Sequence, residues 1–181
     1  MAATVSIRFV ERFPEPAFAE LQRETFAPLE SPSAEFAATV RAERATSGSV
    51  DPSHLPPMIR FGAYSDEQLV GWTYGSFQRL DRFHVANSGV LPSHRRHGLY
   101  SQVVVAIAEY ARAHGAATVH SQHAVLNTPI IIAQLKLGFI IAGTTFSEHL
   151  GLQVQLVHYA SKKRANMFHN RVVPFAWPYD P

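Results

Sequence analysis

Apolar residues recur along this chain at two spacings, which predict strands and helices in a mixed order. Seven stretches are rich in β-branched and aromatic residues or alternate between apolar and polar positions, as β-strands do. We expect strands at Val5–Val10, Met58–Tyr64, Leu69–Gln78, Phe83–Leu91, Thr118–Val125, Phe139–Phe146 and Leu150–Tyr159. The polar residues between the second and third of these stretches predict an antiparallel hairpin.

Helical spacing appears in the segments that separate these strands. Pro16–Phe26 is one such segment, and a second helix is expected from about Ser33, before a loop rich in Ser, Gly and Pro over Ser47–Pro57. The clearest helix begins at Leu99 and ends at His114-Gly115; its apolar positions are Val103, Val104, Ile107 and Ala111.

A further helix is expected between Asn127, which can cap it, and Gly138, which ends it. Its sides are nearly all apolar, so we expect this helix to be buried. The whole pattern predicts one mixed α/β domain over residues 1–160, followed by a C-terminal extension over residues 161–181 with too little periodicity to classify.

Composition narrows the possible functions. The chain has 181 residues, 46% hydrophobic and 17% charged, which is an ordinary globular balance. It has no cysteine, which excludes disulfides, thiolate metal sites and a cysteine nucleophile. The net charge of +2 is too small to indicate a nucleic-acid partner, and no segment resembles a leader or a membrane span, so we expect a cytoplasmic protein with no membrane partner and no metal.

The most informative segment lies where a predicted strand ends and the clearest helix begins, from Val90 to Tyr100. The first N–H groups of a helix have no internal partners, so a loop that enters a helix is suited to hold an anion. Gly98 allows close backbone approach, and Arg95, Arg96 and a protonated His97 add donors suited to a diphosphate. The alternative interpretation is a solvated turn. The glycine patterns of nucleotide hydrolases and of dinucleotide folds are both missing.

Two segments carry a family resemblance. Val90, Pro92, Arg95 and Gly98 match the loop V-x-P-x-x-R/Q-x-x-G-x-G/A, with Tyr100 in place of the final small residue. Downstream, the segments 127–130 and 135–139 look like N-x-P-A and the end of L-Y-x-K-L-G-F. The chain therefore resembles the GNAT superfamily of acyl-CoA-dependent N-acetyltransferases.

The resemblance implies an α+β fold whose mostly antiparallel sheet of about seven strands has one splayed strand pair and about four flanking helices. It also implies direct transfer of an acetyl group from acetyl-CoA to a primary amine of a small molecule or peptide, without a metal. A non-catalytic acyl-CoA-binding or regulatory module is the alternative. The cofactor-binding residues that it implies are Ser88, Gly89, Val90, Arg95, Arg96, His97, Gly98, Leu99, Tyr100, Ser101 and Asn127. For Asn127, helix capping is an equally good interpretation.

The resemblance leaves the acid and the base open. Gln134 stands where similar proteins often have a tyrosine acid, and an amide cannot supply that proton. For the general base we consider His84, His120 and His123, and we choose His123, against the alternative of a hydrogen-bonded core histidine.

Two aromatic groups have less specific interpretations. The aromatic residues of the predicted hairpin either line a pocket for the amine acceptor or pack in the core. These residues are Trp72, Tyr74 and Phe77. Those of the C-terminal extension suit an anchored arm, which makes a homodimer possible; they are Phe168, Phe175, Trp177 and Tyr179.

Overall fold

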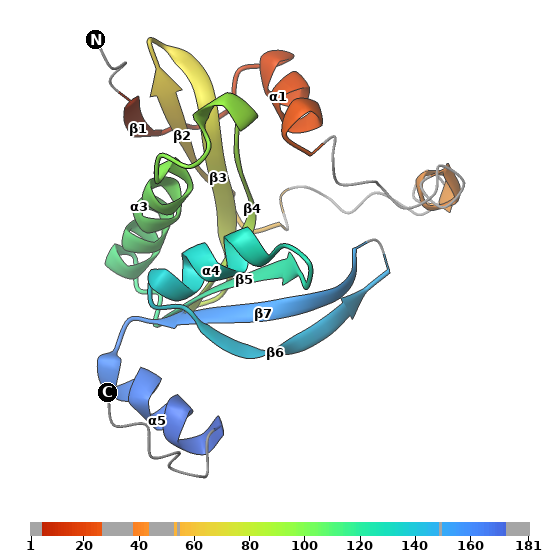
Figure 1. The fold of residues 1–181 in the computed structure, drawn as a ribbon. Coiled ribbons are helices and arrows are strands. Elements are labelled where there is room, and N and C mark those ends of the chain that lie inside the picture. Colours follow the sequence, from red (N-terminus) through yellow and green to blue (C-terminus); the bar gives the residue numbers. More distant parts are fainter. Residues whose placement is uncertain (1–4, 27–37, 44–52, 54, 149, 173–181) are drawn as a thin grey trace.

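Seven strands form a single sheet in the order β1-β2-β3-β4-β5-β7-β6 (Figure 1). The structure is a computed structural model that describes residues 5–26, 38–43, 53, 55–148 and 150–172. Every neighbouring pair of strands is antiparallel except β4 and β5, which are parallel. The strands are β1 (Val5–Phe9), β2 (Ile59–Ser65), β3 (Gln68–Arg79), β4 (Arg82–Val90), β5 (Thr118–Ala124), β6 (Ile140–Ser147) and β7 (Gly151–Tyr159). The predicted mixed, mostly antiparallel α/β sheet is confirmed.

The helices lie close to the predicted segments. They are α1 (Ala17–Phe26), α3 (Leu99–Ala113), α4 (Thr128–Lys136) and α5 (Lys162–Val172), with a short 3-10 turn, η2 (Pro92–His94), and a helical stretch over 38–43. The expected start of the second helix at Ser33 lies outside the described residues, as do 47–52 and 54 of the predicted loop. Helix α5 falls in the C-terminal extension, of which residues 173–181 lie outside the described part.

The two faces of the sheet are covered by different helices (Figure 1). Helix α3 packs its predicted apolar side against β2, β3 and β4, where Val103, Val104 and Ile107 are fully buried. Helix α1 lies on the other face, and Phe18 packs there against Trp72 with ring centroids 5.3 Å apart. Because Trp72 is itself completely buried, the hairpin aromatics serve the core there and the pocket interpretation of Trp72 is wrong.

The prediction that α4 is buried is wrong. Its only buried residue is Gln134, whereas Ile132 and Leu135 are 47% and 39% exposed. The helix lies on the surface beside β5 (Figure 1). Its one amide side chain turns inward and accepts a hydrogen bond from Ser121. An apolar composition therefore does not decide which side of a short helix meets the sheet.

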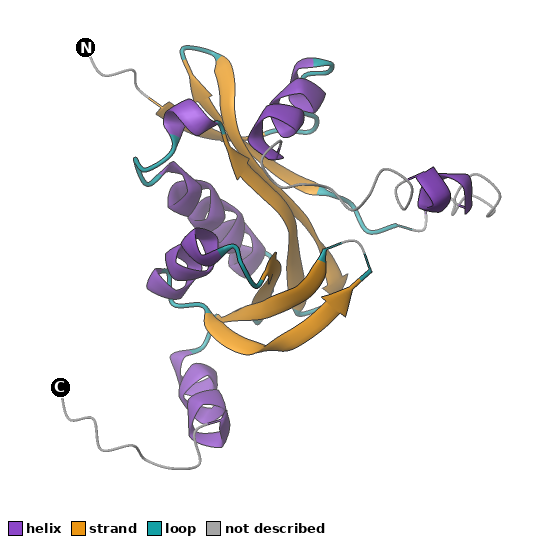
Figure 2. Ribbon diagram, turned by 45° about the vertical axis from the view of Figure 1, so that its right-hand side comes forward, coloured by secondary structure: helices purple, strands orange, loops and turns teal. Residues whose placement is uncertain are grey.

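Helix α5 lies beyond the end of β7 (Figure 2). Phe168 contacts Tyr159 with ring centroids 5.8 Å apart, which ties the start of the extension to the sheet. Within the described part of the chain, no helix is both long enough and apolar enough to span a bilayer.

Candidate functional site

Strands β4 and β5 separate and leave a V-shaped gap in the sheet. They pair only at their beginnings, and the last paired residues are His84 and His120. From there β4 continues to Val90 alongside β3, while β5 continues to Ala124 alongside β7. Each strand thus turns an unpaired backbone edge toward the gap, where an extended ligand can bind by main-chain hydrogen bonds.

A β-bulge explains why β4 leaves its neighbour. Tyr74 of β3 pairs with Asn87, and Gly75 pairs with Val85, so Ala86 has no partner on β3. An extra residue of this kind bends a strand and increases its local twist. The bulge lies directly after the last residue that pairs with β5, which is where the gap opens.

The loop between β4 and α3 presents free amides at the start of the helix. Arg96 has φ +67° and Gly98 has φ +75°, so the backbone turns in the left-handed region just before Leu99. The amide of Gln102 bonds the carbonyl of Gly98, and in the described structure no amide from Arg96 to Ser101 has a hydrogen-bond partner. Together with the helix dipole, these amides form a cradle that fits a phosphate group.

Arg95 does not extend into this cradle. Its Nε donates to the carbonyl oxygen of Val90 at 3.1 Å, and its Nη2 donates to the carbonyl oxygen of Thr25 in α1 at 3.0 Å. The guanidinium therefore holds the loop against two other elements of the fold. Arg96 and His97, which are exposed as Arg95 is, lie next to the free amides in the loop.

The end of β4 is held rigidly on the side away from the gap. The hydroxyls of Ser88 and Thr73 are 2.8 Å apart, and Trp72 donates through Nε1 to Asn87 Oδ1 at 2.7 Å. A Cβ at Gly89 would clash with the Trp72 ring, so only glycine fits there. These contacts fix the strand whose other edge faces the gap.

Asn127 occupies the N-cap position of α4, but its side chain makes no capping hydrogen bond. The capping interpretation is therefore wrong. The side chain is half-buried at the end of β5, near the wide end of the gap, and it stays predicted as a contact for the cofactor.

Of the three candidate histidines, His84 and His120 lie at the narrow end of the gap, and His123 lies three residues further along β5. His84 and His120 are register partners on one face of the sheet, and His120 Nε2 lies 3.0 Å from Thr118 Oγ1. His123 lies on the opposite face of β5, and its buried Nε2 has no hydrogen-bond partner among the described residues. Burial lowers the pKa of His84, and it lowers the pKa values of His120 and His123 to about 4, although an interaction with the Gln134 side chain opposes this effect at His123. All three rings are therefore neutral at pH 7.

Gln134 connects β5 to the first turn of α3. Ser121 Oγ donates to Gln134 Oε1 at 2.5 Å, and Gln134 Nε2 donates to the hydroxyl oxygen of Tyr100 at 3.0 Å. Gln134 is completely buried and Ser121 is 1% exposed. Burial also raises the pKa of Tyr100 to about 12, although the bond from Gln134 opposes this effect.

A family model, the acetyltransferase (GNAT) family, matches residues 16–139, which include β4, the amide cradle, the gap and α4. The chain belongs to the GNAT acetyltransferase family. It is therefore an acetyltransferase, as the two motifs indicate.

Solved structures agree on the fold of this acetyltransferase. The chain is similar to the ribosomal-protein-S18-alanine N-acetyltransferase from Escherichia coli, with 16% identity, a TM-score of 0.65, and coverage of 87% of this chain and 95% of that one. It is also similar to a GNAT family acetyltransferase from Elizabethkingia anophelis with acetyl-CoA bound, with 12% identity, a TM-score of 0.58, and coverage of 86% and 97%. A Bacillus subtilis acetyltransferase in complex with CoA is similar as well, with 16% identity and a TM-score of 0.60. The match covers 87% of this chain and 100% of that one. No curated protein matches the chain.

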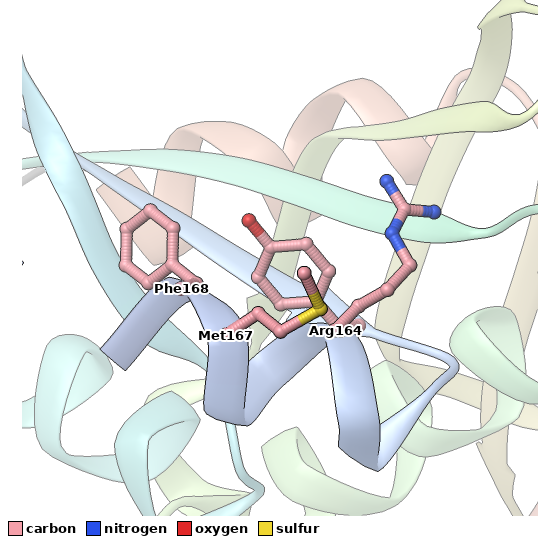
Figure 3. A pocket seen from close by; sticks show the side chains of 4 residues that line it. Arg164, Met167 and Phe168 are labelled. Carbon is pink, nitrogen blue, oxygen red and sulfur yellow. The ribbon is translucent and has the colours of Figure 1, made fainter. Parts of the chain in front are cut away.

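Two small hollows lie away from the gap of this acetyltransferase. One, of about 220 Å³, lies between α5 and the end of β7, where Arg164, Met167 and Phe168 project from one side of the helix (Figure 3). The other, of about 100 Å³, lies between α3 and the segment after α4. Neither is lined by the amide cradle or by the three histidines. Within the described ranges, no group of three or more metal-ligating side chains occurs.

Sequence reasoning missed two features of the site. The first is Ser121, whose hydroxyl holds Gln134, and the second is the structural role of Arg95. The signal for the first was present, because a single amide inside an otherwise apolar helix needs a polar partner when it is buried. No local signal pointed to Thr25, which is 70 residues away from Arg95 in sequence.

Proposed function

We propose that this chain transfers an acetyl group from acetyl-CoA to a primary amine of a small molecule or peptide, by direct attack within a ternary complex. The observation that carries the proposal is the cradle of unpaired amides from Arg96 to Ser101, next to a gap with two unpaired strand edges. The cradle fits a diphosphate, and the strand edges fit the amides of an extended arm. When it is bound, acetyl-CoA supplies an activated acyl group as a thioester.

The residues of the chain then have separable tasks. The amides of the cradle and the side chains of Arg96 and His97 bind phosphate, while the free edge of β4 orients the arm toward the narrow end of the gap. A neutral histidine accepts the proton that the attacking amine loses. His123 stays our choice, because it lies on β5 beyond the last residue pair with β4 and its Nε2 is buried without a hydrogen-bond partner in the described structure.

A matched pair of glycine variants tests the cradle. Gly98 and Gly115 lie at opposite ends of α3, both have positive φ, and a Cβ at either would meet no atom within 4 Å. We therefore expect Gly98→Leu and Gly115→Leu to lose similar stability, about 1–2 kcal/mol each. Only Gly98→Leu is expected to weaken acetyl-CoA binding, by about tenfold or more, because only its side chain enters the phosphate cradle.

Isothermal titration calorimetry with acetyl-CoA measures this difference, and release of free CoA across a panel of amines measures turnover. The panel includes polyamines, aminoglycosides, amino acids and peptide N-termini. Equal affinities of the two variants would disprove the cradle. Tight acetyl-CoA binding with no turnover on any amine would instead favour the non-catalytic module.

A further inference from the structure

Three elements around the narrow end of the gap are joined by one chain of hydrogen bonds, Ser121 to Gln134 to Tyr100. Ser121 is the first residue of β5 beyond the last pair with β4. Tyr100 is the second residue of α3, and its backbone amide is part of the cradle. Gln134 lies between them on α4 and is completely buried.

The amide gives this chain of hydrogen bonds a direction. The oxygen of Gln134 only accepts and its nitrogen only donates, so the nitrogen that bonds Tyr100 makes the tyrosine hydroxyl an acceptor. The hydroxyl proton of Tyr100 therefore takes no part in the hydrogen bonds between Ser121, Gln134 and Tyr100. No acceptor for it occurs among the described residues. A half-buried O–H that is fixed in place by one bond is a preorganised donor.

The ring of Tyr100 packs against two clusters of the core that both include residues of β4. It packs against the cluster that contains Val119 and Leu156 of β5 and β7, and also against the cluster that contains Val70 and Val90 of β3 and β4. These contacts place the ring under the sheet, and the hydrogen bonds through Gln134 connect its hydroxyl to Ser121, directly beyond the last residue pair of β4 and β5.

We propose that Tyr100 is a catalytic residue whose O–H donates a hydrogen bond to the thioester sulfur while the carbon–sulfur bond breaks, with Gln134 as the positioning residue. This inference rests on the proposed function and adds a residue role to it. Tyr100 thus supplies a free O–H donor, whereas the amide nitrogen of Gln134 is engaged in holding the tyrosine oxygen.

The step balances without a further reactant. The nitrogen lone pair of the amine forms a bond to the carbonyl carbon, the carbon–sulfur bonding pair moves to sulfur, and the amine proton goes to the histidine base or to water. The proton of Tyr100 stays on oxygen, because a thiolate, with a reference pKa near 8.5, is too weak a base to remove it from a phenol with a pKa of about 12. Tyr100 therefore stabilises the developing negative charge on sulfur as a hydrogen-bond donor.

The complex with free CoA tests this role without turnover. Because the protein has no cysteine, the thiol of bound CoA is the only thiol in the sample, and its ionisation is followed by thiolate absorbance between pH 6 and 9.5. We expect binding to lower the thiol pKa by about one unit in the wild type, as a charge-assisted hydrogen bond does. Tyr100→Phe is expected to abolish this lowering with less than a threefold change in CoA affinity, and to reduce kcat by about a hundredfold.

The matched control is Tyr110→Phe, on the same helix. Tyr110 packs against Phe9 and His114 near the opposite end of α3 and takes no part in the hydrogen bonds of Gln134, so its variant is expected to keep the wild-type thiol pKa. Gln134→Leu removes the orienting amide and keeps the Tyr100 hydroxyl, so it is expected to lose part of the lowering. It also gives a second test if Tyr100→Phe does not fold.

Each outcome is decisive. A thiol pKa that is unchanged by binding, or one that stays lowered in Tyr100→Phe, overturns the role of Tyr100 while CoA binding still supports the proposed function. If calorimetry shows no CoA binding to the wild type, the proposed function and the inference both fail.

Discussion

The pH dependence of stability follows from the buried histidines, and His123 provides the clearest case. In the unfolded chain this imidazole takes up a proton near its ordinary pKa of 6.5, whereas burial lowers its pKa to about 4 in the folded protein. Between these two values the unfolded state binds more protons than the folded state. The free energy of unfolding therefore decreases as the pH falls from about 6.5 to about 4, and this histidine changes it no further below that.

The size of the effect follows from the same two values. A lowering from 6.5 to about 4 corresponds to at most about 3 kcal/mol of stability lost for this one histidine. His84, His120 and His158 act in the same direction, because burial lowers the pKa of each. We expect His123→Gln, which keeps a polar side chain and removes the titration, to flatten the pH dependence by about 2–3 kcal/mol.

Urea denaturation at pH 7.5, 6.5, 5.5 and 4.5 measures this difference for the wild type and the variant. His169→Gln is the control, because His169 is exposed on α5, and it is expected to follow the wild-type curve. Parallel curves for the wild type and His123→Gln would show that this imidazole is not buried in a neutral state.

Two further predictions concern the end of β4 and the loop that follows it. Gly89→Ala is expected to destabilise the protein by about 1–3 kcal/mol in urea denaturation, because the new methyl group would clash with the buried Trp72 ring; no loss would show that the indole moves aside. Arg95→Gln is expected to lower the free energy of unfolding by about 1–3 kcal/mol, because the carbonyls of Val90 and Thr25 lose a charged donor. The exposed Arg96→Gln serves as its control and is expected to change stability by less than about 0.5 kcal/mol while weakening acetyl-CoA binding; equal losses of stability would contradict the assignment of Arg95 to the fold.

The sequence by itself determined the order of the strands and helices, because hydrophobic periodicity and turn chemistry are local properties. The start of α3 at Leu99 and the glycine just before it could be predicted in this way. So could the family, since the residues that match its two motifs are close together in the chain.

Only the tertiary structure decided which side of each element is buried and which side chains meet. Helix α4 looked buried from its composition, yet only Gln134 turns inward, because its polar partners are on β5 and α3. Arg95 looked like a phosphate ligand, yet its side chain reaches a carbonyl of α1 that lies 70 residues earlier in the sequence. Contacts of this kind depend on how distant elements pack, and no local pattern encodes that packing.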